Sequence, residues 1–355
     1  MKAIVINPMS SRRPTGMGVA GRGLVECFPE CGDEAAEGVY RFINDRIKGG
    51  FLKMILRQMA AEFFAWRHRG RALIFSTHQG PLLRHPRSVV IVHDFIAIRH
   101  PFQNRMQALG FLFLLPRILK KASAVVVISA HVREDLLGYF PKLCKEKRIQ
   151  IIPSITPRLE VFKQGGEEWP QRLEAGRLLF VGASYLHKRL DAAIEAVVEL
   201  RGKGWKVGMD IVGVSQGIWE QAYGVNFEGL KAHGIVAKPY VSDSELENLY
   251  SKAMALLFLS ECEGLGFPPL EAMRKNCPVV CNDTAALRET CGEAAFFVDI
   301  ARKGAVAGIL EQMMSGKLAQ EMKQKILLGS EQTKKYDRAR ITSQWVELIQ
   351  EVESR

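Results

Sequence analysis

The sequence contains no long apolar segment. Its longest run, Ala108–Leu115, is much shorter than the roughly 20 residues that a helix needs to cross a bilayer. It also opens without a secretory signal, because Met1–Asn7 leads directly into a strand-like pattern. We therefore expect a cytoplasmic protein that meets a membrane, if at all, only at the inner face.

Cysteines are few and do not form a metal-binding pattern. The chain has seven, and the two closely spaced pairs, Cys27 with Cys31 and Cys277 with Cys281, lack a matching second pair. This pattern predicts a reduced protein without a zinc site.

Acidic residues are scarce in the first half of the chain. Residues 1–170 hold 26 Lys and Arg against 14 Asp and Glu, whereas residues 171–355 hold 23 against 24. A basic first half predicts an anionic partner: nucleic acid, an anionic membrane or a phosphorylated acceptor. Because the basic residues are not interleaved with aromatic stacking motifs, nucleic acid ranks last and we expect none to bind.

The length of 355 residues predicts two domains of ordinary size. Short β-branched runs alternate with helical patterns, notably helices over Ile47–Arg67 and Arg105–Lys121, which indicates parallel α/β architecture. The strand candidates are Ala3–Asn7, Ala72–Ser76, Val89–His93, Ala124–Ile128, Ile149–Ile152, Leu178–Val181, Lys206–Val212, Ala255–Leu259, Val279–Cys281 and Ala295–Val298.

A polar, turn-rich stretch, Gln164–Pro170, separates the two series of strands and is interpreted as the linker. The expected domains are therefore residues 1–165 and 171–335. The remaining residues, 336–355, are expected to form a helix with Trp345, Leu348 and Ile349 on one face.

The most informative stretch is Glu263–Glu271, which places two carboxylates eight positions apart. It follows the apolar run Ala255–Leu259, and a glycine turn and a helix start lie between the two glutamates. A strand, a glycine turn and a helix N-terminus bring backbone N–H groups and the helix dipole together, which favours a bound anion. The stretch therefore predicts a binding site.

Motifs around this stretch form an ordered set. Tyr240–Tyr250 and Ala253–Ser260 precede it, and Pro278–Val280 and Leu287–Ala295 follow it. Together they resemble the E-x7-E region of retaining glycosyltransferases with the GT-B fold, in particular the large family 4 (glycosyl transferases group 1). The resemblance is strong from about Leu178 to Asp299 and weaker in the first half.

The resemblance implies an α/β fold of the GT-B type, in which two Rossmann-like parallel-sheet domains face a central cleft. The first domain would take the acceptor and the second the nucleotide-sugar donor, while the C-terminal helix would cross back to the first domain. It also implies a retaining, metal-independent transfer to a glycan or lipid-linked saccharide in bacterial surface polysaccharide biosynthesis. The absence of an Asp-x-Asp motif agrees, no cofactor is expected, and GDP-mannose is our guess for the donor.

Relatives usually carry a basic residue at the position of Lys188, and the resemblance implies that it holds the donor diphosphate, whose negative charge grows as the glycosidic bond breaks. It comes shortly after Gly182, at which the preceding strand ends. Many relatives carry an arginine directly after that glycine, where this chain has Ala183. His187 or Arg189 is expected to compensate for the missing arginine.

Both glutamates acquire roles from the resemblance. Glu271 would accept hydrogen bonds from the ribose hydroxyls, and Glu263 would bind the donor sugar without acting as a nucleophile. Backbone amides in the turn between them, those of Gly264, Leu265, Gly266 and Phe267, would contact the sugar and the phosphates.

In the first half, Gly16–Gly21 formally satisfies G-x-G-x-x-G, but eight residues separate it from the first strand, which argues against a dinucleotide fingerprint. The resemblance instead implies that Gly16 and Gly18 approach the donor phosphate. His93, followed by Asp94 at a strand end, would lie near the reacting sugar, and Ser129 matches a family serine of less defined purpose.

The segment Lys48–Arg71 is basic and rich in large apolar residues. A helix of this kind either lies on an anionic membrane or buries its apolar stripe in the core. Both interpretations remain open at the level of the sequence.

Two other functions remain as alternatives. A nucleotide-sugar 2-epimerase shares the two-domain layout, although none of its motifs is recognisable here. A non-catalytic transferase-like subunit is favoured by Ala183 and disfavoured by the presence of Lys188, Glu263 and Glu271 together.

Overall fold

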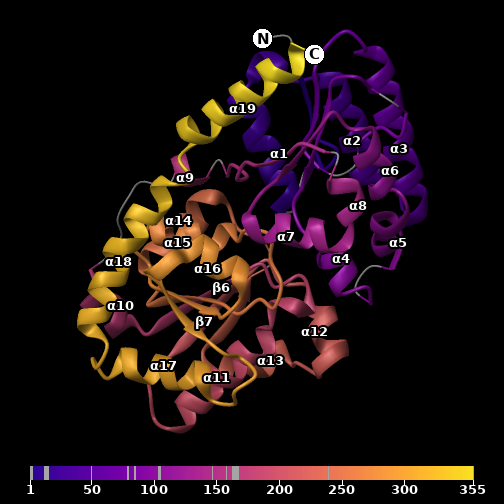
Figure 1. Ribbon diagram of the computed structural model, residues 1–355. Helices are drawn as coiled ribbons and strands as arrows, with labels where there is room; N and C mark the ends of the chain where they lie inside the picture. The colour runs from indigo at the N-terminus through magenta and orange to yellow at the C-terminus, as the bar shows by residue number, and fades with distance from the viewer. Residues whose placement is uncertain are drawn as a thin grey trace. The chain divides into compact units, whose positions relative to one another are not determined.

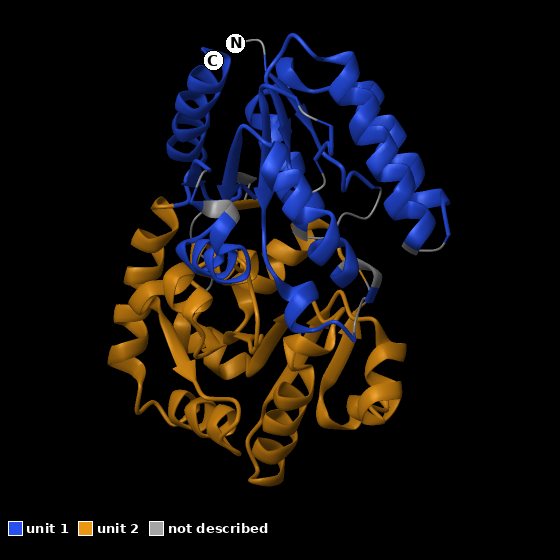
Figure 2. Cartoon of the chain, turned by 45° about the vertical axis from the view of Figure 1, so that its right-hand side comes forward, with its two compact units in different colours: residues 1–157, 336–355 blue, residues 158–335 orange. Residues whose placement is uncertain are grey.

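The computed structural model describes residues 3–11, 16–48, 50–77, 80–83, 85–102, 105–145, 147–156, 158–161, 168–238 and 240–354. The chain forms two compact units (Figure 2). Unit 1 comprises residues 1–157 and 336–355, and unit 2 comprises residues 158–335. Each unit is described by itself.

Unit 1 contains a parallel sheet of five strands in sequence order. All of its strands except the last are fully buried, as the continuous apolar runs of the sequence predict for a sheet covered on both faces. Val5 also pairs with Gly32 on the free side of the first strand. The strands are β1 (Ile4–Ile6), β2 (Leu73–Phe75), β3 (Ser88–Val92), β4 (Ala124–Val127) and β5 (Ile149–Ile151).

Helices connect these strands (Figure 1). They are α1 (Gly16–Cys27), α2 (Glu34–Arg46), α3 (Gly50–Arg67), α4 (Ile96–Arg99), α5 (Arg105–Phe113), α6 (Leu115–Lys121), α7 (Ala130–Tyr139) and α8 (Pro141–Cys144), with a short 3₁₀ turn at Pro29–Cys31. None of the described helices is long and apolar enough to cross a membrane.

The single helix expected over Arg105–Lys121 is in fact two, α5 and α6, with Leu114 between them. Pro116 lies in the first turn of α6. Proline has no N–H group and its ring clashes with the carbonyl four residues earlier, so the first helix cannot continue through this position. The expectation of one helix was wrong because it followed the apolar residues and ignored this proline.

Unit 2 contains a parallel sheet of six strands in the order β11-β10-β9-β6-β7-β8. The strands are β6 (Arg177–Val181), β7 (Gly208–Val212), β8 (Ile235–Lys238), β9 (Ala255–Phe258), β10 (Val279–Asn282) and β11 (Ala295–Val298). The sequence analysis missed β8, an edge strand with one neighbour. Its sequence is short and ends in Lys238, and in the structure Val236 is exposed, as expected for an edge strand.

Helices cover both faces of the unit 2 sheet. Alternate residues of β6 point to opposite cores, Leu178 and Phe180 to one and Leu179 to the other. The helices of the unit are α9 (Arg158–Val161), α10 (Trp169–Ala175), α11 (Leu190–Gly202), α12 (Gln216–Tyr223), α13 (Phe227–Leu230), α14 (Asp243–Lys252), α15 (Phe267–Arg274), α16 (Ala285–Cys291), α17 (Ala305–Met314) and α18 (Ala319–Lys334), with 3₁₀ turns at Leu186–Lys188, Lys231–His233 and Gly292–Ala294.

The stretch interpreted as a linker does not coincide with the division between the units. That division falls between Pro157 and Arg158, and Trp169 begins α10 inside unit 2. Residues 164–167 of the stretch lie outside the described residues. Glycine and proline there suggested a turn, but Pro170 stands in the first turn of a helix, where its missing N–H has no consequence.

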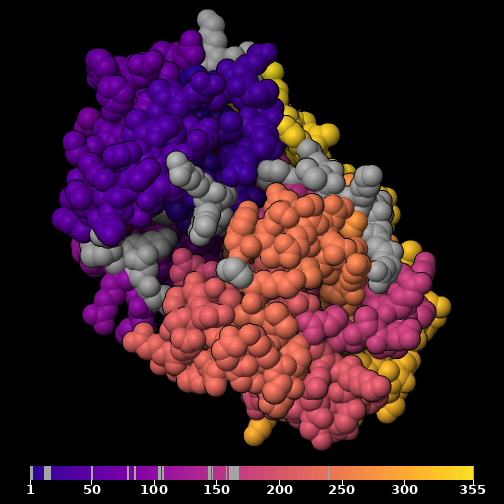
Figure 3. Space-filling model, turned by 180° about the vertical axis from the view of Figure 1, so that it is seen from behind, coloured from indigo at the N-terminus to yellow at the C-terminus, as the bar shows by residue number. Residues whose placement is uncertain are grey.

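The last helix, α19 (Arg338–Glu353), belongs to unit 1, although the residues directly before it in the sequence belong to unit 2. Its buried face includes Trp345, Leu348 and Ile349, the residues that the helical spacing selected. The Arg338 guanidinium donates to the Glu26 carbonyl at the end of α1. Figure 3 shows this helix, in yellow, against the indigo residues at the start of the chain.

Candidate functional site

The order of strands in unit 2 creates a topological switch point between β6 and β9. From β6 the chain moves outward in one direction to β7 and β8, and then returns to the other side for β9, β10 and β11. Open parallel sheets bind ligands beyond the carboxyl ends of the strands at such a point. The loops that follow β6 and β9 are therefore the first place to look for a site.

These two loops are joined by hydrogen bonds. The backbone N–H of Glu261 donates to the His187 carbonyl at 2.9 Å, and the Ser260 hydroxyl donates to the same carbonyl at 3.4 Å. Asn282, the last residue of β10, donates a side-chain amide hydrogen bond to the Ser260 carbonyl at 3.2 Å. The carboxyl edge of the sheet is thus a connected framework that can position side chains.

Lys188 and Glu263, one on each loop, form an ion pair through Lys188 Nζ and Glu263 Oε1. The Lys188 ammonium also lies 5.2 Å from the ring centre of Phe258, the last residue of β9. The side chains of Lys188 and Glu263 are 17% and 10% exposed, respectively. Both predicted residues are therefore held together, poorly hydrated but still accessible, at the switch point.

The two neighbours of Lys188 point elsewhere. Arg189, which adopts a left-handed conformation with φ 56°, pairs with Asp191 at 3.0 Å and Glu261 at 2.8 Å, and these contacts raise its pKa. The His187 ring is buried and stacks on Tyr185 with ring centres 5.7 Å apart. Of these three basic side chains, Lys188 is the one that meets Glu263.

Ala183 has no room for the arginine that many relatives carry there. Its side chain is fully buried, and its carbonyl accepts the Trp219 indole N–H at 2.8 Å and the Ser215 backbone N–H at 3.3 Å. A large charged side chain at this position would have to leave the core of unit 2. Gly182, just before it, has φ 88° and open space where a Cβ would lie.

The turn between the two glutamates leads into the N-terminus of α15. Gly266 has φ 98°, and a Cβ there would come within 3.3 Å of Leu287, so this turn requires glycine. Gly264 and Leu265 are buried, and Phe267, which is half-buried, begins the helix. The first N–H groups of a helix have no partner within it and carry the positive end of its dipole, so this terminus can hold an anion.

Glu271 is fully buried in α15. One carboxylate oxygen accepts the Tyr250 hydroxyl at 2.9 Å, and the other lies 3.5 Å from Arg158 Nη1. Burial raises the pKa of Glu271, while the charge of Arg158 opposes that rise. Arg158 is held more closely by Asp243, at 2.8 Å.

The sequence analysis missed Arg158 entirely. It stands about a hundred residues before its partner Glu271. Tyr250 belonged to a quoted motif, but nothing in the sequence linked its hydroxyl to Glu271. Only the packing of α9 and α14 against α15 brings these groups together.

In unit 1, His93 follows β3 and is buried. Its Nε2 lies 2.6 Å from the Ser76 carbonyl, which fixes the proton on that nitrogen, and its Nδ1 lies 3.3 Å from the Ser154 hydroxyl. Burial lowers the pKa of His93 and so favours the neutral ring, although the hydrogen bond to Ser76 opposes this effect. A sugar contact by a ring nitrogen would have to replace the Ser154 hydroxyl.

Two other residues singled out near β3 and β4 have local structural partners. The Asp94 carboxylate accepts the backbone N–H of Ile96 at 3.0 Å. The Ser129 hydroxyl accepts the N–H of Val132 at 3.2 Å and caps α7. These contacts account for a short polar side chain at each position.

The first glycine cluster lies inside α1 rather than in a turn, because Gly16 begins that helix. This position argues against a dinucleotide fingerprint, as the spacing from the first strand does. The Gly18 carbonyl accepts the Asn7 amide at 3.3 Å, and a Cβ at Gly21 would come within 2.4 Å of Asn7. Residues 12–15, directly before the helix, lie outside the described residues.

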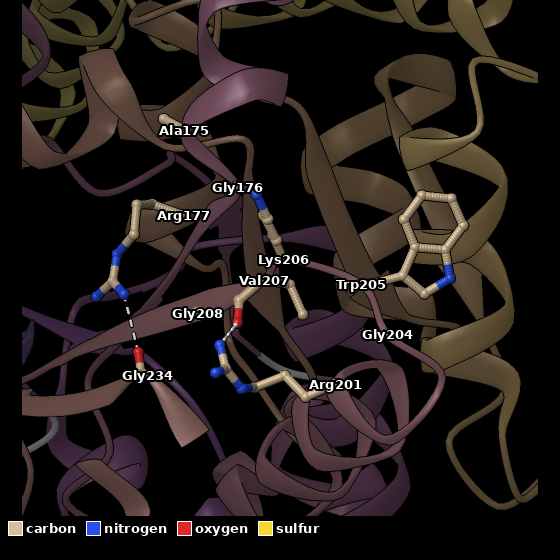
Figure 4. Close-up of a pocket in the computed structure, with 10 residues that line it drawn as sticks. All are labelled: Ala175, Gly176, Arg177, Arg201, Gly204, Trp205, Lys206, Val207, Gly208 and Gly234. Carbon is tan, nitrogen blue, oxygen red and sulfur yellow. Dashed lines mark hydrogen bonds between the residues drawn. The ribbon is translucent and has the colours of Figure 1, made fainter. Parts of the chain in front are cut away.

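A cavity of about 380 Å³ opens at the opposite edge of the unit 2 sheet (Figure 4). It is lined by residues at the amino ends of β6, β7 and β8, far from the loops that carry the ion pair. Arg177 there donates to the Gly234 carbonyl at 2.8 Å, and Arg201 donates to the Val207 carbonyl at 2.9 Å. These arginines tie backbone segments together, and the edge is the wrong one for a ligand of a parallel sheet.

Comparisons with known proteins identify sequences and structures that are similar to this chain. Residues 167–327 match the family model of glycosyl transferases group 1. The O-antigen chain mannosyltransferase RfbU of Salmonella typhimurium (strain LT2) is 30% identical over 234 residues, which cover 64% of this chain and 61% of RfbU. The serotype-specific mannosyltransferase WbdA of Escherichia coli is 24% identical over 250 residues, covering 63% of this chain and 29% of WbdA. The chain therefore spans less than two thirds of either relative.

Solved structures share the fold. The crystal structure of Anabaena HepE in complex with UDP matches with a TM-score of 0.70 at 14% identity, over 99% of this chain and 100% of that chain. Sucrose-phosphate synthase from Thermosynechococcus elongatus matches with a TM-score of 0.65 at 15% identity, over 86% of this chain and 79% of that chain. With the two parallel sheets, these likenesses confirm the GT-B fold expected from the sequence.

Proposed function

We propose that this chain, a GT-B protein whose residues 167–327 match the glycosyl transferases group 1, moves a sugar from a nucleotide-sugar donor to a saccharide acceptor. The observation that carries the proposal is the Lys188–Glu263 pair at the switch point of unit 2. A cation and a carboxylate on adjoining loops suit a substrate with an anionic diphosphate and a hydroxyl-rich sugar.

In this proposal Lys188 acts on the leaving group. Cleavage of the bond between the sugar and the diphosphate leaves one more negative charge on the nucleotide, and a fixed ammonium stabilises that charge. The N-terminus of α15 faces the same edge and adds its partial positive charge. With these groups supplying the positive charge, the transfer is proposed to need no metal ion.

Glu263 is proposed to bind the hydroxyls of the donor sugar and to stabilise the positive charge that develops at the anomeric carbon. Its pairing with Lys188 orients the carboxylate before the substrate arrives. We propose that the configuration at the anomeric carbon is retained. The acceptor attacks from the same face of the sugar from which the leaving group departs, and Glu263 forms no covalent bond.

Glu271 is proposed to accept the ribose hydroxyls. A carboxylate offers about four lone-pair positions, and Tyr250 occupies one of them at 2.9 Å. The contact with Arg158 is long, at 3.5 Å, and Arg158 keeps Asp243 as a partner. Ribose hydroxyls can therefore replace Arg158 on Glu271 without leaving the guanidinium unpaired.

The proposed donor sugar and acceptor are based on the names of the similar proteins. RfbU and WbdA are named mannosyltransferases, which supports mannose as the donor sugar and a glycan of a bacterial surface polysaccharide, free or lipid-linked, as the acceptor. GDP-mannose is the donor that we propose to test first, although HepE was solved with UDP. The reaction is proposed to take place in the cytoplasm, at the inner face of the cell membrane.

A thermal-shift screen of the purified protein tests the proposal. Ligands that bind only the folded state raise the melting temperature, so UDP, GDP, ADP, TDP, CMP and their sugar conjugates can be compared directly. A selective shift by one nucleoside diphosphate and its sugar conjugate is expected. No shift with any of them, in a folded sample, would contradict a nucleotide-sugar enzyme.

The buried Ala183 supports a second candidate, a transferase-like subunit that binds a glycan without catalysis. Release of nucleoside diphosphate from the donor in the presence of acceptor separates the two. A protein that binds the donor but never releases the diphosphate, with any extract of saccharide acceptors, would favour the subunit. Conversion of the free donor without acceptor would instead indicate an epimerase.

A further inference from the structure

The apolar side chains of α3 do not all enter the core. Six large ones point to solvent along one side of the helix, with exposed fractions from 38% at Ile55 to 62% at Met59. Most recur every three or four residues, so they form one stripe. They are Phe51, Leu52, Ile55, Met59, Phe63 and Trp66. The alternative left open by the sequence, a stripe buried in the core, is wrong for these residues.

Helix α5 extends this stripe. It packs on α3, where a Cβ at Gly110 would lie 3.5 Å from the Met54 sulfur, and it exposes Leu109, Leu112 and Phe113. Figure 1 labels α3, α5 and α6 along one side of unit 1. We call the nine exposed apolar side chains of α3 and α5 the docking surface. They account for nine of the 22 exposed large apolar residues described in the chain.

Basic residues predominate in the segments that carry the docking surface, and we call the exposed ones its basic rim. Residues 46–71 hold seven Lys and Arg against one acidic residue, Glu62, and residues 105–121 hold four against none. Glu62 is turned inward, where it accepts the Leu82 backbone N–H at 2.5 Å and the Gln58 amide at 3.0 Å. The exposed basic residues are Arg46, Lys48, Arg67, Arg69, Arg71, Arg105, Arg117, Lys120 and Lys121.

The apolar stripe and the basic rim together indicate which kind of partner the docking surface binds. A second copy of the chain would place two basic rims against each other, which opposes a symmetric dimer. Nucleic acid would match the charge but not the aliphatic stripe. An anionic lipid surface matches both, because hydrocarbon takes the apolar side chains and the headgroups take the cations.

We propose that the docking surface lies in the plane of an anionic membrane, with the apolar side chains at the hydrocarbon boundary and the basic rim at the headgroups. Unit 1 as a whole supports this, since it holds 27 Lys and Arg against 15 Asp and Glu. The inference extends the lipid-linked acceptor of the proposed function to a physical surface. The binding itself requires no transferase activity and can be measured alone.

The test is co-sedimentation of the full chain with vesicles of phosphatidylcholine alone and of phosphatidylcholine mixed with phosphatidylglycerol. Binding is expected only to the anionic vesicles and is expected to weaken as salt screens the basic rim. A chain that stays in solution with anionic vesicles at low salt would overturn the proposal.

Two pairs of variants locate the surface. Phe51→Ser with Met59→Ser removes two exposed apolar side chains, and vesicle binding is expected to fall by at least about tenfold. The matched control is Leu327→Ser with Leu328→Ser, two exposed leucines on α18 of unit 2. Lys120→Glu with Lys121→Glu is expected to abolish the preference for anionic vesicles, whereas Lys323→Glu on unit 2 is expected to keep it.

Two other results of these experiments would contradict membrane binding by the docking surface. Equal binding by the Phe51 and Met59 variant and by its control would overturn the proposal. A dimer in light scattering that this variant converts to a monomer would assign the surface to a second copy instead. Nucleoside-diphosphate thermal shifts are expected to be unchanged in all four variants, so a failure of membrane binding leaves the proposed transferase function untouched.

Discussion

The ammonium of Lys188 and the carboxylate of Glu263 meet across the switch point of the unit 2 sheet, although 75 residues separate them in the sequence. Each is carried by a loop at the carboxyl end of a central strand, and backbone hydrogen bonds join the loops. The pair places a positive and a negative group side by side where a parallel sheet receives its ligand.

Replacement of Lys188 by alanine is expected to lower turnover with the nucleotide-sugar donor by about 10² to 10³-fold, the usual effect of removing one charge-stabilising group. Lys188→Arg is expected to recover part of the loss because it keeps the charge. Steady-state release of nucleoside diphosphate measures the effect. Lys238→Ala, which removes a half-buried lysine paired with Glu245, is the control. Near-normal turnover of Lys188→Ala would shift the diphosphate contact to Arg189.

Glu271→Gln is expected to weaken nucleotide binding by about tenfold to a hundredfold, because hydrogen bonds to a charged acceptor are worth about 1.5–3 kcal/mol. Calorimetric titration with the nucleoside diphosphate selected by the thermal-shift screen measures the change. Glu228→Gln, at an exposed glutamate paired with Lys231, is expected to have no effect. An unchanged dissociation constant for Glu271→Gln would exclude the ribose contact.

The pH dependence of nucleotide binding is expected to report on Arg158. Burial raises the pKa of Glu271 above its ordinary value, and only the ionised form accepts two hydroxyls, so affinity is expected to fall as the pH drops toward that raised pKa. Arg158→Gln removes a charge that lowers this pKa. The loss of affinity is therefore expected to begin at higher pH in the variant.

Dissociation constants measured from about pH 5 to about pH 8 would show the shift, since each pH unit below the pKa costs about tenfold in ionised carboxylate. Glu271→Gln provides the control, because its binding is expected to lack this pH dependence. If the pH at which half of the affinity is lost were equal or lower in Arg158→Gln than in the wild type, the assigned interaction between Arg158 and Glu271 would be contradicted.

Arg172 is a buried arginine that donates hydrogen bonds to backbone carbonyls. It donates to Tyr250 and Ala253 at 3.1 Å and to Lys275 at 2.7 Å, tying the ends of α14 and α15 together. Arg172→Met leaves these carbonyls without their donor and is expected to lower the free energy of unfolding by at least about 3 kcal/mol. Chemical denaturation compares it with Gln171→Met, an exposed position on the same helix, where little change is expected.

Removal of divalent metal is expected to leave the transfer reaction intact. In the proposed mechanism Lys188 and the α15 N-terminus supply the positive charge for the leaving diphosphate. Activity in excess EDTA, with and without added magnesium, measures this directly. A strict requirement for a divalent ion would show that these groups are insufficient.

Much of the fold follows from the sequence. Among the described residues, ten of the eleven strands were expected close to their observed bounds, because buried parallel strands are short continuous apolar runs between turn residues. The exception, β8, has one neighbour and therefore a weaker pattern. Pro116 could also have predicted the break in the helix expected over Arg105–Lys121, but the prediction relied on the apolar periodicity alone.

The sequence by itself determined the fold class and the positions of Lys188, Glu263 and Glu271, since strand, glycine turn and helix start are local patterns. Only the tertiary structure decided what those side chains meet. It paired Lys188 with Glu263, enclosed Glu271 between Tyr250 and Arg158, buried Ala183 and turned the stripe of α3 outward. These relationships depend on contacts between residues far apart in the chain, which periodicity and spacing do not encode.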